Sequence, residues 1–204
     1  MSLYQHLILP PLLHLAMRQE SLTPFRRRVI GAAEGRVLEI GIGSGLNLPL
    51  YGLGVRSVIG LEPSRELLRM ARPRAATAVV PVELLEASAE VLPLEHGTID
   101  TVVTTWTLCT IPDAQAALAE VRRVLKPGGK LLFVEHGRAP EPGVARWQDR
   151  LDPLWRRLAG GCHLNRQIDA LIAGSGFTIE AMTNTRLSGP RTHTFLYEGQ
   201  AHPA

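Results

Sequence analysis

The segment from Val37 to Asn47 constrains the fold of this chain more than any other part of the sequence. Its apolar residues lead into Glu39 and Ile40, and glycines then stand at Gly41, Gly43 and Gly45. An apolar strand that ends in such a loop and then opens a helix is typical of a nucleotide site in a doubly wound α/β sheet. Glycine is needed there because the backbone takes positive φ or lies directly against a ligand.

The spacing of the glycines separates two classes of cofactor. A dinucleotide fingerprint, G-x-G-x-x-G, starting at Gly41 would need its third glycine where Leu46 stands. The sequence instead has E-x-G-x-G-x-G, with Glu39 two residues before the first glycine. S-adenosylmethionine (SAM) has no pyrophosphate to cradle, and its cationic amino-acid end attracts a carboxylate. The loop therefore predicts SAM binding, and a dinucleotide oxidoreductase is the disfavoured alternative.

Further cofactor contacts are predicted at the ends of later strands. Glu62, after the second predicted strand, can accept hydrogen bonds from both hydroxyls of a ribose. Ser88 is a small polar residue that could meet the adenine amine, and Thr105 with Trp106 would lie beside the reacting methyl group. The predicted cofactor-binding residues are Glu39, Gly41, Gly43, Gly45, Asn47, Glu62, Pro63, Ser88, Ala89, Glu90, Thr105 and Trp106.

Strand-like and helical segments alternate along the chain, which is typical of a parallel-sheet α/β fold with helices on both faces. The predicted strands are 36–40, 57–61, 82–86, 98–105 and 130–135, with 177–183 and 192–197 as a closing pair.

Capping residues predict where the helices begin and end. Ser64, Asp113 and Thr23, which precedes a proline, are expected N-caps. Pro73 is expected to end the helix that Ser64 begins, and the turn 126–129 to end the helix that Asp113 begins.

The domain organisation predicted is an N-terminal helical segment, 1–34, covering the active site, followed by one α/β domain, 35–204. A long insertion, 137–165, interrupts that domain after the fifth strand and holds an apolar helical face. Two interpretations stay open for the insertion: a packed connector, or a segment that lines the substrate pocket. The residues of its apolar face are Trp147, Leu151, Leu154, Trp155 and Leu158.

The composition limits the classes of partner that the protein is expected to bind. The 204 residues carry a net charge of only +3 without a run of five or more like charges, which argues against specific nucleic-acid binding. Two cysteines, Cys109 and Cys162, predict neither a disulfide framework nor a zinc cluster, so no metal is expected and a cytoplasmic setting fits best.

The apolar stretch from Leu7 to Met17 is too short to span a bilayer and lacks the features of a signal peptide. One interpretation is a helix lying over the active site. The other is an interfacial segment that makes weak contact with a membrane surface.

Together these motifs resemble the class I SAM-dependent methyltransferases over nearly the whole chain. The matching segments are 39–47, Glu62, 87–93 and 123–129, although Ser88 replaces the acid that is usual there. The resemblance implies a Rossmann-like sheet of seven strands in the order 3-2-1-4-5-7-6, with the seventh antiparallel. It also implies SAM as cofactor and S-adenosylhomocysteine as product.

A narrower resemblance, to small methyltransferase-like proteins that methylate alkyl thiols, is carried by 108–109, 133–136, Trp147, 151–155 and 161–166. It implies methyl transfer to a small, partly apolar acceptor such as a thiol. Those relatives carry an N-terminal membrane anchor, whereas this chain has only a short apolar N-terminus. Alternatives are a phospholipid amine, a quinone precursor, or SAM binding without catalysis. The oligomeric state stays open.

Two histidines are candidate catalytic residues. A thiol must reach the thiolate to attack, and a neutral imidazole can take its proton. His136, at the end of the fifth predicted strand, and His163, in the insertion, are the candidates. The alternative for each is a structural hydrogen bond.

Overall fold

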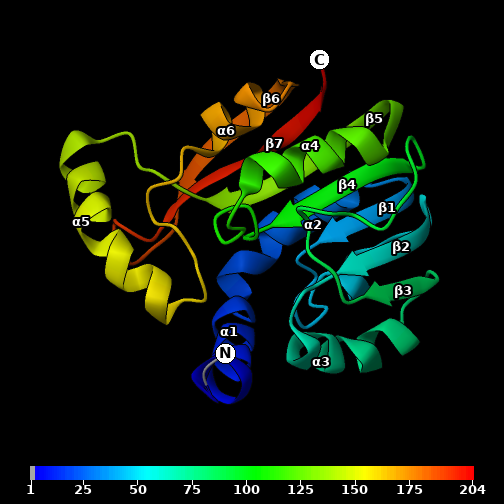
Figure 1. The fold of residues 1–204 in the computed structure, drawn as a ribbon, viewed down its shortest axis with the longest axis horizontal. Helices are drawn as coiled ribbons and strands as arrows, with labels where there is room; N and C mark the ends of the chain where they lie inside the picture. The colour runs from blue at the N-terminus through cyan, green and yellow to red at the C-terminus, as the bar shows by residue number, and fades with distance from the viewer. Residues whose placement is uncertain (1–2) are drawn as a thin grey trace.

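The computed structural model describes residues 3–204, whose strands form one sheet (Figure 1). The strands are β1 Gly35–Ile40, β2 Val55–Leu61, β3 Val82–Leu85, β4 Ile99–Thr105, β5 Leu125–His136, β6 Phe177–Arg186 and β7 Phe195–Pro203. Their order is β3-β2-β1-β4-β5-β7-β6. The strands β1 to β5 pair in parallel, and β7 pairs antiparallel with both β5 and β6. The predicted order and directions are confirmed.

Helices lie between the strands and before β1. They are η1 Tyr4–Ile8, α1 Leu9–Met17, η2 Glu20–Leu22, α2 Thr23–Gly31, η3 Leu48–Leu50, α3 Arg65–Ala76, α4 Ala114–Val124, α5 Pro142–Leu158 and α6 Ile168–Gly174. Of these, η1 is a π-helix, and η2 and η3 are single 3₁₀ turns.

The central strands are apolar on both faces because helices cover both sides of the sheet. Val37 of β1 packs in a cluster with residues of α2 and α3, whereas its neighbour Leu38 packs with residues of α4 and α6. Successive side chains of a strand point to opposite faces, so one strand serves two cores. This sandwich fixes the ends of β1 and β4, from which the candidate site is built.

The predicted caps are confirmed at two helices. The Ser64 hydroxyl accepts a hydrogen bond from the Leu67 amide at 3.3 Å, and the Asp113 carboxylate accepts one from the Ala116 amide at 2.9 Å. Thr23, in contrast, lies within α2, whose N-cap is Leu22. Its hydroxyl therefore does not cap that helix.

Pro73 does not end α3, which continues to Ala76. The last turn is held by Arg74, whose guanidinium donates to the carbonyls of Met70 and Ser44. The bond to Ser44 ties this turn to the glycine loop and offsets part of the local cost of the proline, which sequence alone could not weigh.

The predicted turn at 126–129 is also different in the structure. The helix α4 ends at Val124, and β5 begins at once with Leu125. The pairing then moves from Ile99↔Leu125 to Thr101↔Lys130, so residues 126–129 form a bulge within the strand rather than a separate turn.

Two helices lie beyond the arrowhead ends of the parallel strands, α1 and α5 (Figure 1). The π-helix η1, which leads into α1, contacts the end of α5, where the Tyr4 hydroxyl donates to the Leu158 carbonyl at 2.6 Å. The carboxyl edge of the sheet therefore faces both the N-terminal segment and the insertion. Within residues 3–204, no helix is long and apolar enough to cross a membrane.

The buried face of α5 is polar, which the sequence did not predict. Gln148 is fully buried and accepts from the Ala139 amide at 2.8 Å while donating to the Gly137 carbonyl at 3.0 Å. Asp152 is buried and accepts from the Leu164 amide at 2.8 Å. The apolar face is largely turned outward, with its exposed members Trp147, Leu154 and Leu158 more than half accessible to solvent.

Candidate functional site

The glycine loop follows β1 directly, with φ values of +69° at Gly41, +56° at Gly43 and +78° at Gly45. A side chain at Gly41 would collide with Thr107, so the loop lies tightly against the segment after β4. A Cβ at Gly43 would meet only the Gly41 carbonyl, at 3.9 Å. The loop therefore leaves open space on that side of Gly43, where a flat ligand can lie against the backbone.

Glu39 is a buried carboxyl group beneath this loop. It accepts hydrogen bonds from Asn47 Nδ2 at 2.8 Å and from the Tyr51 hydroxyl at 2.8 Å. Burial raises the pKa of Glu39 to about 7, although these hydrogen bonds and the charge of Arg26 act in the opposite direction. A cation placed beside Glu39 would favour its ionised form.

Glu62 lies at the end of β2 and closes the loop from the other side. Its carboxylate accepts from the Gly43 amide at 3.1 Å and from the Ser64 amide at 3.0 Å, across Pro63. Burial raises the pKa of Glu62, against the effect of these two bonds. A carboxylate has about four acceptor positions, so hydroxyl groups of a ribose can still bind to it.

The segment after β3 is hydrogen-bonded to the start of α4. The Ser88 hydroxyl donates to Glu90 Oε2 at 2.7 Å, and Glu90 Oε1 accepts from the Asp113 amide at 2.8 Å. Ala89 is buried in the core. Adenine contacts by Ser88, Ala89 and Glu90 stay predictions.

Thr105 is the last residue of β4, and Trp106 follows it beside the glycine loop. Thr105 Oγ1 accepts from Asn47 Nδ2 at 3.0 Å, so Asn47 links Thr105 to Glu39. Trp106 has φ +53°, and no other non-glycine residue in the described part of the chain has positive φ. The Arg26 guanidinium lies 4.8 Å from the centre of the Trp106 ring.

Two N-terminal residues that sequence reasoning missed reach this site. Arg26 is buried and donates to Asn47 Oδ1 at 2.7 Å, and His14 Nδ1 lies 2.7 Å from the Ser44 hydroxyl. Arg26 shares a helical face with Val29 and Ile30, an i, i+3, i+4 pattern that could have indicated its burial. These contacts support the prediction that residues 1–34 cover the site, which remains a proposal.

The two candidate catalytic histidines lie in different surroundings. His136 is 6% exposed, and neither ring nitrogen has a nitrogen or oxygen partner among residues 3–204. The expected alternative, a structural hydrogen bond, is limited for His136 to the neighbouring Cys162 thiol. His163 Nδ1 lies 3.6 Å from Asp152 Oδ2, and burial, with the charge of Arg166, lowers the pKa of His163.

His136 belongs to a cluster that we call the CHC group: Cys109, His136 and Cys162. One potential ligand atom from each residue lies within 4.8 Å of the others, and the two sulfur atoms are 3.6 Å apart. Beside it, burial raises the pKa of Glu135 to about 7, although the Thr107 amide donates to this carboxyl at 3.1 Å. No spacing pattern in the sequence indicates this cluster, because its members come from three separate segments.

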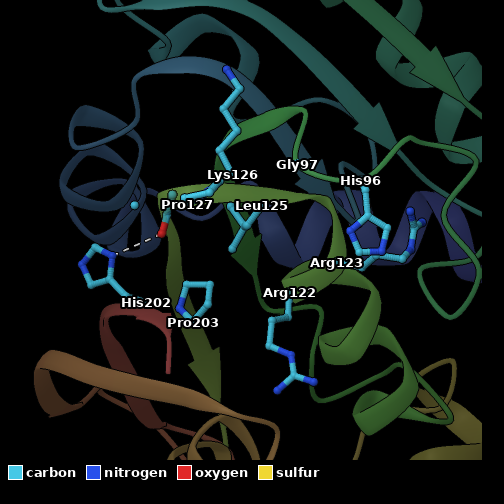
Figure 2. A pocket seen from close by; sticks show the side chains of 11 residues that line it. His96, Gly97, Arg122, Arg123, Leu125, Lys126, Pro127, His202 and Pro203 are labelled. Atoms are coloured by element: carbon cyan, nitrogen blue, oxygen red, sulfur yellow. Dashed lines mark hydrogen bonds between the residues drawn. The ribbon is translucent and has the colours of Figure 1, made fainter.

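A hollow of about 530 Å³ lies at the opposite edge of the sheet (Figure 2). His96, Lys126 and His202 are among the residues around it, and they stand at the amino ends of β4 and β5 and at the end of antiparallel β7. Open α/β sheets bind ligands at the carboxyl ends of their strands. This hollow is therefore not part of the candidate site.

Comparison with known proteins supports the same assignment. A family profile described as "Methyltransferase domain" matches residues 38–133. Thiol S-methyltransferase TMT1B of Rattus norvegicus is 33% identical over 66% of this chain, which spans 56% of that relative. Phosphatidylethanolamine N-methyltransferase of Cereibacter sphaeroides is 32% identical over 86% of both chains.

A solved SAM-dependent methyltransferase of Methanosarcina mazei superposes with a TM-score of 0.65 at 25% identity, covering 81% of this chain and 91% of its own. The matched profile, the bacterial relative aligned over most of its length and this shared fold agree with one another. All of them imply SAM as the cofactor. The chain belongs to the class I SAM-dependent methyltransferases, near the group that includes the thiol S-methyltransferases.

Proposed function

We propose that this protein transfers the methyl group of SAM to the sulfur of a small alkyl thiol. The observation that carries the proposal is the pairing of two features at the carboxyl edge of the sheet. The open glycine loop between Glu39 and Glu62 suits SAM, and His136, buried at the end of β5 on the same edge, suits a base for a small acceptor. The rat relative, by its name, acts on thiols.

The residues present fit the cofactor. SAM supplies a methyl group on a positively charged sulfur, which is already electrophilic. Gly43 leaves space for the nucleoside, Glu62 offers acceptor positions to the ribose, and Glu39 offers negative charge to the amino-acid end. The task left to the other residues is to align the acceptor and exclude water.

The acceptor must lose its proton before it attacks. A free thiol has a pKa of about 8.5, so most of it is protonated at pH 7. His136, with its unpartnered ring nitrogens, and His163, whose ring is neutral at pH 7 because its pKa is lowered, can each accept that proton. Both assignments are proposals.

A phospholipid amine is the second candidate acceptor, because the Cereibacter sphaeroides relative spans most of this chain and is named for phosphatidylethanolamine. An amine acceptor does not have to form a thiolate before it attacks, and it can react in a site that is more open to solvent. Product analysis separates the two candidates.

The test is a methyl-transfer assay with three acceptors: a short alkyl thiol, phosphatidylethanolamine in detergent, and a quinone precursor. We expect S-adenosylhomocysteine and the methyl thioether to appear in equal amounts with the thiol. Turnover of the lipid or the phenol alone would reject the thiol acceptor. Binding of NAD without any response to S-adenosylhomocysteine would reject the cofactor assignment.

We also propose weak contact with a membrane surface through the N-terminal segment. Five of its apolar side chains are half or more exposed: Leu3, Leu7, Ile8, Leu12 and Leu15. Such a row of side chains suits the boundary between headgroups and acyl chains. Leu7→Ser with Leu12→Ser should lower sedimentation with anionic vesicles, whereas Leu53→Ser, 92% exposed elsewhere, should not. Equal sedimentation of all three proteins would remove this contact.

A further inference from the structure

The CHC group has the composition of a transition-metal site. Its two thiols and one imidazole are the ligand types that zinc prefers, and three protein ligands with one open position are typical of catalytic zinc. The sulfur atoms of Cys109 and Cys162 lie 3.6 Å apart. A tetrahedral zinc ion with bonds of about 2.3 Å to each sulfur needs a separation of about 3.8 Å. The two cysteines are therefore already placed for a shared metal.

His136 supplies an independent observation. The side chain is 94% buried, and both ring nitrogens lack a nitrogen or oxygen partner among the described residues. Buried polar groups without a partner are costly, and a bound ion is one of the explanations that such a group calls for in a native fold. A metal ion between His136 and the two sulfur atoms would satisfy one of these nitrogens.

The backbone around the group is held from several directions. The His163 amide donates to the Cys109 carbonyl at 2.8 Å, so the two cysteine-bearing loops are tied together. The Arg166 guanidinium donates to the carbonyls of Leu108 and Ile111, on both sides of Cys109. His136 is the last residue of β5 and pairs with Leu196 of β7. Ligands on such rigid supports need little rearrangement to bind an ion.

We propose that Cys109, His136 and Cys162 bind one zinc ion whose fourth position is open to the sulfur of the acceptor. This replaces the expectation, drawn from only two cysteines, that the chain holds no zinc. The group lies past the ends of β4 and β5, on the same edge as the glycine loop. Its place as an acceptor site rests on the proposed function, whereas its binding of zinc does not.

The open position gives a balanced route for the thiol. On binding there, the acceptor thiol loses its proton to solvent or to His163, because His136 is a zinc ligand in this arrangement and no longer serves as the base. A lone pair of that sulfur then forms the new bond to the methyl carbon. The sulfonium carbon–sulfur bond breaks, and its electron pair stays on the sulfur of S-adenosylhomocysteine. The products are a neutral thioether, which is a weak ligand, and the neutral nucleoside.

The first test measures metal, not turnover. Purified protein is freed of metal under reducing conditions and titrated with zinc sulfate or cobalt chloride. We expect one equivalent to bind, and cobalt to show thiolate charge-transfer bands. The chain has only two cysteines, so protein-derived bands must come from this group. No tight metal binding, or a Cys109–Cys162 disulfide in mass spectra of freshly prepared protein in place of metal, would overturn the proposal.

Variants locate the ion. Cys162→Ser and His136→Gln should each weaken zinc binding by about 100-fold or more, because even an outer partner of a ligand contributes 10–100-fold. His163→Gln is the matched control. His163 follows Cys162 in the sequence, but its ring lies against Asp152 and is not part of the CHC group. Circular dichroism checks that each variant is folded. If a variant does not fold, the cobalt charge-transfer bands of the wild-type protein still test whether the cysteines bind the metal. Equal zinc affinity in all three variants would place the metal elsewhere and overturn the assignment.

A final measurement separates the two proposals. Adding a short alkyl thiol to the cobalt-loaded protein should change the cobalt spectrum as a third sulfur binds. An unchanged spectrum at saturating thiol would overturn the open acceptor position. If zinc binds as described but the loaded enzyme methylates only amines or phenols, the metal site stands and the thiol function fails.

Discussion

Replacing Glu39 with glutamine should stabilise the cofactor-free protein and weaken cofactor binding. Burial raises the pKa of this carboxyl from 4.5 to about 7. At 1.36 kcal/mol per pH unit, that difference corresponds to about 3 kcal/mol of unfolding free energy. The cost to the native state builds up from pH 4.5 and is complete above about pH 7, where Glu39 is ionised in both states.

The sign of the pH dependence follows from the raised pKa. Below pH 4.5 the carboxyl is protonated in both states, so Glu39 costs nothing. Between pH 4.5 and about 7 the unfolded chain ionises and the folded chain resists, so the free energy of unfolding falls as the pH rises. A protonated carboxyl and an amide have similar hydrogen-bonding groups. Glu39→Gln should therefore match the wild type near pH 4.5 and exceed it by about 3 kcal/mol at pH 8.

Urea unfolding followed by circular dichroism at both pH values measures this difference. Glu83→Gln, at an exposed position on β3, is the control and should track the wild type throughout. Calorimetry with S-adenosylhomocysteine should show weaker binding to Glu39→Gln, because the negative charge facing the amino-acid end is gone. A stability difference that is the same at both pH values, or that favours the wild type at pH 8, would refute the argument.

Four further substitutions test the site. Glu62→Ala should weaken SAM binding by about 1.5–3 kcal/mol in calorimetry, the scale of hydrogen bonds to a charged group; unchanged affinity would misplace the ribose. Gly43→Val should abolish binding, whereas Gly128→Val, also at positive φ with open space around it, should cost only backbone strain of about 1–2 kcal/mol and leave binding intact. Trp155→Ala should lower kcat/KM for an alkyl thiol more than it lowers SAM affinity, and equal losses would remove Trp155 from the acceptor site. His163→Ala should lower kcat near pH 7 and recover partly near pH 9, where free thiols ionise unaided; identical pH profiles would exclude His163 as a base.

Local chemistry explains which parts of the fold were predictable from the sequence. The strand before Gly41 and the caps Ser64 and Asp113 depend on neighbouring residues only, so their patterns survive in the structure. The sheet order followed from the family resemblance. The continuation of α3 through Pro73 depends on Arg74 bonding to a distant loop, and no local pattern contains that partner.

The residues of the candidate site that belong to one loop were predictable from the sequence. Those that come together from distant segments were not. Glu39, Asn47 and Thr105 form one hydrogen-bonded chain, as the cofactor prediction required them to be close. Arg26 and His14 approach from helices whose docking angle the sequence does not encode locally. The CHC group combines a loop after β4, the end of β5 and a loop after α5, so only the assembled sheet edge brings it together.

The left-handed backbone at Trp106 limits how this site can be redesigned. Such a conformation costs a non-glycine residue about 1–2 kcal/mol. Here the Trp106 amide donates a hydrogen bond to the Val134 carbonyl at 2.8 Å, which helps to hold the conformation. In a library of variants randomised at position 106, the ability to fold would remove many variants before any activity could be selected. Glycine, asparagine and aspartate would pass because they tolerate the geometry, whereas β-branched residues would be lost. Substitutions meant to broaden acceptor specificity are therefore better tolerated at residues with ordinary backbone conformation than at Trp106, which follows β4.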